Sequence, residues 1–252
     1  MIQYSKQESE LFGVPFGRFE IEEKFEKWDV LRQEIKESPC KFIRIKIKNP
    51  NAEQLDELSS MTSKMHLLEI LRVYRSEDLR ITPIDNKPKD LKIIKVDESL
   101  KDIFTQFILD TYDGIPFGNY TPKCINLIFP IEKQLNGIIS YFKENYIGRD
   151  KDKVAYLFYN QNEKLVGCVV SEYFNNSEND NGTYSYYVGV ARDERKKGLH
   201  YKMGILVKNY TIERGYAYFD GSTRLSNLYS AKAMENHGCK CIRYDWVYLL
   251  EK

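Results

Sequence analysis

The sequence predicts a mixed α/β fold in two parts, a small β/α domain over residues 1–88 and a larger domain over residues 89–252. Short strand and helix patterns alternate in the first part. In the second part, three strand patterns precede alternating helices and strands, which is typical of an antiparallel meander that passes into a βαβ crossover. The charged segment 83–90, which holds two prolines, marks the boundary between the parts.

Five short elements are expected in the first part, because apolar residues alternate along three segments and recur at helical spacing along two others. They are strand 19–21, helix 24–36, strand 42–48, helix 52–60 and strand 67–74.

The second part opens with a strand over 91–96, and Asp97, Glu98 and Ser99 then signal the start of a helix. The polar segment 175–182 is interpreted as a hairpin loop. The remaining elements are helices 131–146, 200–213 and 227–237 and strands 154–159, 165–173, 183–190, 216–220, 239–243 and 246–250.

The composition describes an ordinary folded chain. Of its 252 residues, 42% are hydrophobic and 30% are charged, which excludes the disordered and collagen-like classes. The 38 Lys and Arg nearly balance the 37 Asp and Glu, for a formal net charge of +1. No overall field attracts a nucleic acid or an anionic membrane, so we expect neither partner, and any anion site must be local.

We expect a cytoplasmic protein that is a monomer or a homodimer. The N-terminus lacks the pattern of a signal peptide, and the apolar runs are only as long as strands. The odd number of cysteines, five, suits a reducing compartment. His237, Cys239 and Cys241 lie close together, but C-x-C spacing places both thiols on one face of a strand, so we expect a core strand and no metal site.

The most informative stretch is residues 188–200, where a strand leads through a basic turn into a helix. The positive end of the helix dipole repels the basic residues 195–197, and a bound anion relieves that conflict. Gly198 lets backbone amides approach the anion, and Gly189 within a strand indicates a bulge or a close backbone approach. The alternative is a solvated basic loop. No P-loop or G-x-G-x-x-G follows a strand, so nucleotide triphosphate and NAD are not indicated.

This turn resembles the pyrophosphate loop, Gln/Arg-x-x-Gly-x-Gly/Ala, of the GNAT family of acyl-CoA-dependent N-acetyltransferases. Arg195 and Gly198 match the loop, and His200 replaces its last small residue. The resemblance extends from about Leu91 to the end of the chain.

A second motif of the family is an Asn after the next strand, followed by a helix that ends in Glu-x-x-Gly. Asn227, Glu235 and Gly238 match it. The family usually has a tyrosine immediately before the glutamate, which protonates the departing CoA thiolate, and this chain has Met234 there.

The resemblance implies an enzyme that transfers an acetyl group from acetyl-CoA, its cosubstrate, to a small-molecule amine. An amide near Val190 is expected to polarise the thioester carbonyl, the loop to bind pyrophosphate and Asn227 to contact pantetheine. The expected cofactor-binding residues are Val188, Gly189, Val190, Arg195, Lys196, Lys197, Gly198, Leu199, His200 and Asn227.

A base must take a proton from the substrate ammonium, and Glu172, Tyr186 and Tyr187 are the candidates near the cleft. The sequence does not choose among them. For the proton that returns to sulfur, the candidates are Ser230, Tyr229 or a water molecule.

The opening, residues 8–18, resembles that of a two-domain branch of the family, the TDP-fucosamine (TDP-4-amino-4,6-dideoxygalactose) acetyltransferases. This suggests a first domain that shapes the acceptor pocket and an amino-deoxy sugar on a nucleotide diphosphate as the acceptor. The alternative for these residues is a turn packed by aromatic side chains. Two other functions remain open, a CoA-binding module that does not catalyse and an aminoacyl-transferring relative.

Overall fold

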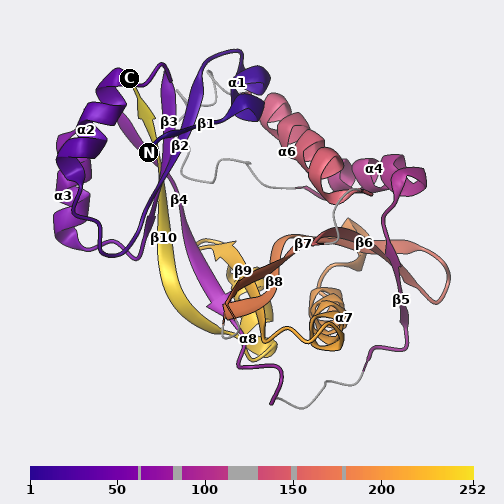
Figure 1. Cartoon of the computed structure of the whole chain (residues 1–252). Helices are drawn as coiled ribbons and strands as arrows, with labels where there is room; N and C mark the ends of the chain where they lie inside the picture. Colours follow the sequence, from indigo (N-terminus) through magenta and orange to yellow (C-terminus); the bar gives the residue numbers. More distant parts are fainter. Residues whose placement is uncertain (62–63, 82–86, 113–129, 149–151, 178–179) are drawn as a thin grey trace.

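The computed structural model describes residues 1–61, 64–81, 87–112, 130–148, 152–177 and 180–252. Within these residues ten strands form one mixed sheet, in the order β1-β2-β3-β10-β4-β9-β8-β7-β6-β5. The sheet is strongly twisted, so β4 and β10 run at a steep angle to β6 and β7 (Figure 1). No helix in the described ranges is long and apolar enough to cross a membrane; the cytoplasmic location stays a prediction.

The first part of the chain contains β1 (Gln3–Tyr4), α1 (Lys6–Phe12), β2 (Phe16–Ile21), α2 (Trp28–Glu37), β3 (Phe42–Lys48), α3 (Ala52–Ser60) and β4 (Met65–Arg75). The bounds predicted for β3 and α3 are confirmed. A capping box starts α3, because Asn51 Oδ1 accepts from the Gln54 amide at 2.8 Å and Gln54 Oε1 accepts from the Asn51 amide at 3.2 Å.

Several features of this part differ from the prediction, and strand β1 is one of them, since no strand was predicted before residue 19. Helix α1 was not predicted, and it ends at Gly13, whose φ of +70° caps the helix in the left-handed conformation. Helix α2 was predicted from residue 24, but Phe25 packs its ring against Phe19 and Trp28 outside the helix, and the helix begins at Trp28.

The second part contains β5 (Leu91–Lys95), α4 (Lys101–Thr111), α6 (Ile131–Tyr146), β6 (Lys153–Asn160), β7 (Leu165–Ser177), β8 (Asp180–Val190), α7 (Leu199–Glu213), β9 (Tyr218–Arg224), α8 (Leu228–Asn236) and β10 (Lys240–Glu251). The bounds predicted for α6 and the parallel crossover from β8 through α7 to β9 are confirmed. The segment 175–182 was predicted as a loop, but β7 and β8 continue into it, with Asn175 opposite Asn181. Exposed polar side chains do not disturb a ladder of backbone hydrogen bonds.

The last strand, β10, corrects a second prediction. The segments predicted as strands 239–243 and 246–250 form one continuous strand. A register shift lies between Cys241 and Arg243, and after it Arg243, Tyr244 and Asp245 all stay paired with β4. The Asp245 carboxylate is buried between Lys46, at 3.0 Å, and Arg243, at 2.9 Å. Strand β10 lies between β3 and β4, so both parts of the chain share one sheet; a domain boundary at residue 88 stays a prediction.

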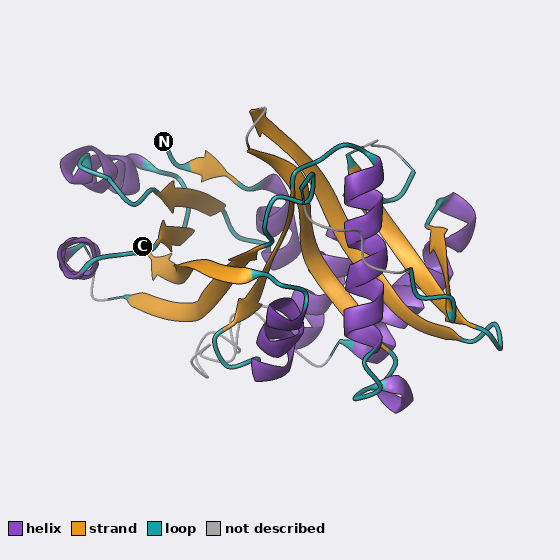
Figure 2. Cartoon of the chain, turned by 90° about the horizontal axis from the view of Figure 1, so that it is seen from below, coloured by secondary structure: helices purple, strands orange, loops and turns teal. Residues whose placement is uncertain are grey.

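Helices lie on both faces of the sheet (Figures 1 and 2). In the second part, α4 and α6 pack on one face, against residues such as Ala155 and Leu157, and α7 and α8 pack on the other, against Tyr156 and Phe158. This alternation is the period of two that a strand covered on both faces requires. In the first part, α2 and α3 cover the face that carries the isoleucines of β3. The arginine and lysines of β3 therefore lie on the other face.

Candidate active site

The sheet opens between β8 and β9. These parallel strands pair only over residues 182–185 and 218–221. Tyr186 is a bulge in β8, since Ser185 lies opposite Ser171 and Tyr187 opposite Val170. Residues 186–190 of β8 have no partner on β9, which instead continues beside β4. The two strands thus enclose a wedge lined by backbone groups.

The bulge lies three residues before the position that the sequence suggested. The sequence suggested a bulge or a close approach at Gly189, and since Gly189 pairs regularly with Cys168, the bulge is wrong at this position. The glycine is needed for close packing, because an added Cβ lies 3.0 Å from the Tyr187 ring and 3.1 Å from both Cys168 Sγ and Thr111 Oγ1.

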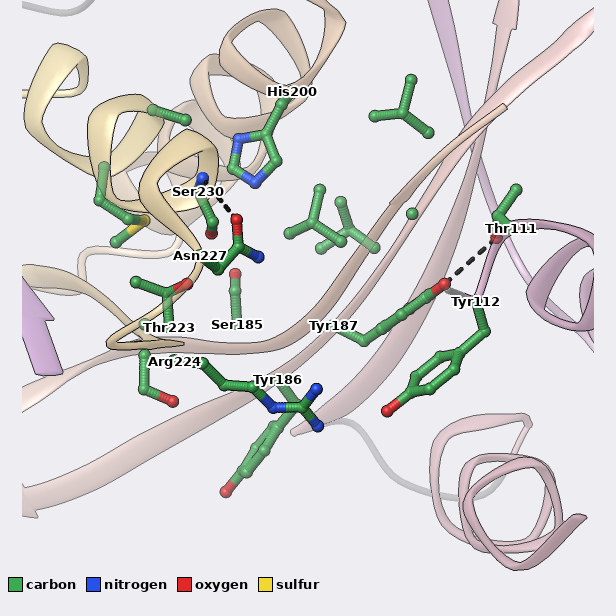
Figure 3. A pocket seen from close by; sticks show the side chains of 18 of the residues that line it. Thr111, Tyr112, Ser185, Tyr186, Tyr187, His200, Thr223, Arg224, Asn227 and Ser230 are labelled. Atoms are coloured by element: carbon green, nitrogen blue, oxygen red, sulfur yellow. Dashed lines mark hydrogen bonds between the residues drawn. The ribbon is translucent and has the colours of Figure 1, made fainter. Parts of the chain in front are cut away.

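A cavity of about 1230 Å³ fills the wedge and extends under the first part of the sheet. Figure 3 shows polar side chains from α4, β8, α7, β9 and α8 around it. Most of the predicted site residues line it: Tyr187, Val188, Gly189, Val190, Arg195, Lys196, Gly198, Leu199, His200, Asn227, Tyr229 and Ser230. Among the described residues, the predicted Lys197 and Glu172 are not part of the lining.

One end of the cavity is the start of α7. Gly198 is the N-cap with a φ of +76°, no side chain caps the helix, and Lys196 before it has a φ of +66°. The first amides of a helix have no acceptor within the helix, and the dipole makes this end positive. The geometry suits a phosphate group.

The basic run divides between two tasks. Arg195 donates to the Thr111 carbonyl at 2.8 Å, and Arg192 donates to the Asp110 carbonyl at 2.8 Å, so both bind the last carbonyls of α4. Lys197 pairs with Glu194 at 2.9 Å. Only Lys196 is an exposed cation that lines the cavity without a partner in the described part. The arginines hold the loop against α4, a role that the charge pattern did not reveal.

Helix α8 contributes the other cofactor-side residues. The side-chain oxygen of Asn227 accepts from the Ser230 amide at 3.1 Å and so caps the helix. Ser230 faces the cavity beside Asn227 (Figure 3), and Tyr229 is 83% exposed. Met234 is buried against β9, where a Cβ on Gly221 lies 3.2 Å from the methionine methyl. Met234 packs as part of the core.

His200 occupies the position of the small residue in the motif. Burial lowers the pKa of its imidazole to about 4, so the ring is neutral near pH 7. Its centroid lies 6.5 Å from that of His237, which packs over Gly204. The described residues contain no group of three or more His, Cys, Asp or Glu placed to hold a metal ion.

The predicted bases differ in their surroundings. Thr111 Oγ1 donates to the Phe107 carbonyl, so the Tyr187 hydroxyl, 3.1 Å away, donates to Thr111. Burial raises the pKa of Tyr187, and burial together with Glu172 raises that of Tyr186. Both phenols stay protonated near neutral pH and are poor bases.

Glu172 lies outside the cavity lining. Its carboxylate accepts from the Tyr146 hydroxyl at 3.3 Å and is 3.9 Å from Lys153. The sequence analysis placed Glu172 near the cleft, but the structure directs its side chain toward Tyr146 of α6.

The far end of the cavity is lined by charged residues that the sequence did not single out. Arg18 and Arg44 bind Glu8, at 2.6 and 3.3 Å. Arg224 on β9 binds Glu69 on β4, at 3.1 Å, and reaches across the cavity (Figure 3). These residues lie far apart in the sequence. The local signal for this end of the cavity is weak: basic residues alternate with isoleucines along β3.

The two carboxyls of this end differ. Burial raises the pKa of Glu69, and although Arg224 and Arg44 oppose it, the pKa stays above its ordinary value. Burial also acts to raise the pKa of Glu8, but Arg44 and Arg18 outweigh it and hold the pKa below its ordinary value. Arg224 also hydrogen-bonds Tyr112, whose ring stacks on Tyr187 at 5.7 Å. Glu69 is therefore linked through Arg224 and Tyr112 to the open part of β8.

No family model matches this sequence, and no curated protein matches it. Solved structures do match the fold. A conserved protein of unknown function from Staphylococcus epidermidis has a TM-score of 0.62 at 12% identity, over 99% of this chain and 90% of that one. A GCN5-related N-acetyltransferase from Kribbella flavida has a TM-score of 0.55 at 9% identity, over 94% and 82%. A GNAT-family acetyltransferase from Colwellia psychrerythraea has a TM-score of 0.54 at 11% identity, over 89% and 71%. The chain has the fold of the GNAT acetyltransferases.

Proposed function

We propose that this chain is an acetyl-CoA-dependent N-acetyltransferase that acts on a primary amine. The observation that carries the proposal is the wedge between β8 and β9, with the uncapped start of α7 at one end and a charged cavity at the other. A long, narrow cosubstrate with phosphates at one end and a reactive acyl group at the other suits this shape.

The chain's own groups suit acetyl-CoA, which supplies an activated acetyl group. The amides of residues 196–201 and the Lys196 ammonium would hold the pyrophosphate. The edge of residues 186–190 that has no partner on β9 would hold the pantetheine arm and place an amide, near Val188 or Val190, at the thioester carbonyl. Asn227 offers its side-chain amide from the opposite side of the wedge.

The transfer needs a base for the proton of the amine. Of the described carboxylates that line the cavity, Glu194 pairs with two lysines at the phosphate end and Glu8 is held by two arginines. Glu69 is the one of these three whose pKa is raised, by burial, and a raised pKa makes a carboxylate a stronger base. We assign proton removal to Glu69 in place of Glu172, Tyr186 and Tyr187.

The transfer also returns a proton to sulfur. Met234 has no proton to donate and is buried. Ser230, which faces the cavity, or a water molecule can supply the proton, and a thiol with a pKa of about 8.5 leaves readily as a thiolate.

The finer identity of the acceptor, an amino-deoxy sugar on a nucleotide diphosphate, rests on the sequence resemblance of residues 8–18 alone. What supports an acceptor role for the first part of the chain is that α1, β2, β3 and β4 all contribute to the cavity. A CoA-binding module without catalysis is the second candidate, favoured by Met234 in place of the tyrosine.

Release of free CoA from acetyl-CoA, measured with a thiol reagent across a panel of primary amines, separates these functions. The proposal predicts release that depends on the amine, with the acetylated amine confirmed by mass spectrometry. Binding of acetyl-CoA with no amine-dependent release from any member of the panel would favour the non-catalytic module.

A further inference from the structure

Two arginines share one glutamate at the end of the cavity that lies beneath the first part of the chain. The Glu8 side chain is only 8% exposed, whereas those of Arg18 and Arg44 are 43% and 30% exposed. All three line the cavity. The carboxylate is thus covered by guanidinium groups that a ligand in the cavity can reach, and the trio has a formal charge of +1.

Among the described residues, no carboxylate other than Glu8 forms an ion pair with Arg18 or Arg44. Glu69, the next one along the sheet, is bound by Arg224. In the adjacent row of side chains, Lys46 pairs with Asp245 at 3.0 Å and Lys48 with Glu20 at 2.7 Å. The neutral groups nearby are the side chains of Gln7, Gln134 and Tyr141.

The arrangement destabilises the charged form of Arg44. Burial lowers the pKa of its guanidinium, Glu8 and Glu69 raise it, and Arg18 lowers it again, so the pKa stays below its ordinary value. A half-buried cation of this kind is stabilised by an added anion. Two guanidinium groups also present several N–H donors that match a carboxylate or a phosphate.

The strand pairing shows how far Arg44 of this trio lies from Glu69. Arg44 lies opposite Leu249 on β10, and Glu69 lies opposite Val247 on the other edge of the same strand. Two strand spacings and an offset of two residues along β10 separate the backbone positions of Arg44 and Glu69 by about 12 Å. An amine that loses its proton to Glu69 therefore has room for a linker that reaches Arg44.

We infer that the acceptor amine also carries an anionic oxo group, a carboxylate or a phosphate, and that Arg18 and Arg44 bind this group beneath the first part of the chain. This inference rests on the proposed acetyl transfer and names the class of its acceptor. The amine faces Glu69 and the wedge, and the anionic group faces the guanidinium groups of Arg18 and Arg44, which cover Glu8.

Matched pairs of amines test the inference. One member of each pair carries the anion and the other lacks it: 6-aminohexanoate against hexylamine, 4-aminobutyrate against butylamine, and glucosamine 6-phosphate against glucosamine. We expect kcat/KM to be about 10- to 100-fold higher for the anionic member, the value of one or two charge-assisted hydrogen bonds. The carboxylate and phosphate pairs show which oxo group fits better.

Variants of Arg44 connect the preference to the trio. Arg44→Gln should lower kcat/KM much more for the anionic member of each pair than for the neutral member, and so remove most of the preference. Arg44→Lys should restore part of the preference, since it keeps the charge but loses the fork. Arg32→Gln is the control, because Arg32 is also ion-paired in the first part of the chain but lies outside the cavity.

The outcomes separate this inference from the proposed function. Equal or better use of the neutral member in every pair would overturn the inference, as would an Arg44→Gln variant that slows both members equally. Acetyl-CoA binding without release of CoA for any amine would overturn the proposed function and with it this inference.

Discussion

The two ends of the cavity are built in different ways. The start of α7 presents backbone amides, positive φ angles at Lys196 and Gly198, and one unpaired lysine, all within a few residues of each other. The far end presents ion-paired side chains from α1, β2, β3, β4 and β9, and these residues are spread along the chain from Glu8 to Arg224. The first end depends on the conformation of the backbone and the second on side-chain chemistry. A substitution that keeps the size of a side chain but changes its chemistry should therefore impair the far end and leave the start of α7 intact.

Glu69→Gln provides the largest test of this contrast. The amide keeps the volume and can still contact Arg224, so we expect the affinity for acetyl-CoA to stay within about twofold. Turnover should fall about 100-fold or more, because a well-placed base contributes 10²- to 10⁴-fold. Single-turnover kinetics with the best amine of the panel measures it.

The pH profile checks the same residue. The pKa of Glu69 is raised, so protonation should remove activity at a higher pH than it would for an ordinary glutamate. This loss of activity on the acid side of the profile should be absent in Glu69→Gln. Glu172→Gln is the matched control and should keep its turnover. Loss of turnover in Glu172→Gln and not in Glu69→Gln would restore the base that the sequence suggested.

Lys196→Ala tests the contribution of the exposed lysine at the start of α7, which we expect to be smaller than that of the backbone amides. An exposed lysine contributes little, so acetyl-CoA binding should weaken about fivefold or less at low salt, and less at high salt. Lys197→Ala should have a smaller effect, because Lys197 pairs with Glu194 and does not line the cavity. Equal effects of the two variants on the dissociation constant would contradict this division of the basic run.

His200 gives a smaller effect, on stability. Its folded-state pKa of about 4 lies below the ordinary value of 6.5, so the unfolded chain binds the extra proton between these pH values. The contribution of His200 to the free energy of unfolding is complete above pH 6.5 and falls as the pH drops toward 4. Denaturant unfolding at several pH values should show a shallower decline for His200→Gln. Identical declines would mean that the ring is not buried in the neutral form.

The geometry at the start of α7 could be predicted from the sequence because it is local. A strand, a basic turn, Gly198 and a helix follow each other directly, and the structure keeps them in that order around the cavity. The amphipathic spacing of 131–146 likewise defined α6 with its correct bounds. The sequence did not show that Arg195 binds the end of α4, since that contact spans 84 residues.

The far end could not be predicted because it depends on the position of β10. The two segments of this strand were expected to belong to the second part of the chain, yet β10 pairs with β3 on one side and β4 on the other. That insertion brings Arg44 and Glu69 to one cavity. The bulge at Tyr186 also depends on pairing across strands, which a period-two pattern does not reveal.

The most direct test of the central claim, that the start of α7 holds the phosphates of CoA, compares Gly198→Asp with Gly215→Asp by titration calorimetry. Both glycines have a φ of +76° and no atom within 4 Å of an added Cβ, and they flank the two ends of α7. The backbone strain of the two substitutions is therefore matched, and only the first places a negative charge at the anion site. We predict that acetyl-CoA binding weakens about 100-fold in Gly198→Asp, from loss of the charge-assisted hydrogen bonds, and less than about twofold in Gly215→Asp. Unchanged binding in Gly198→Asp would contradict the account.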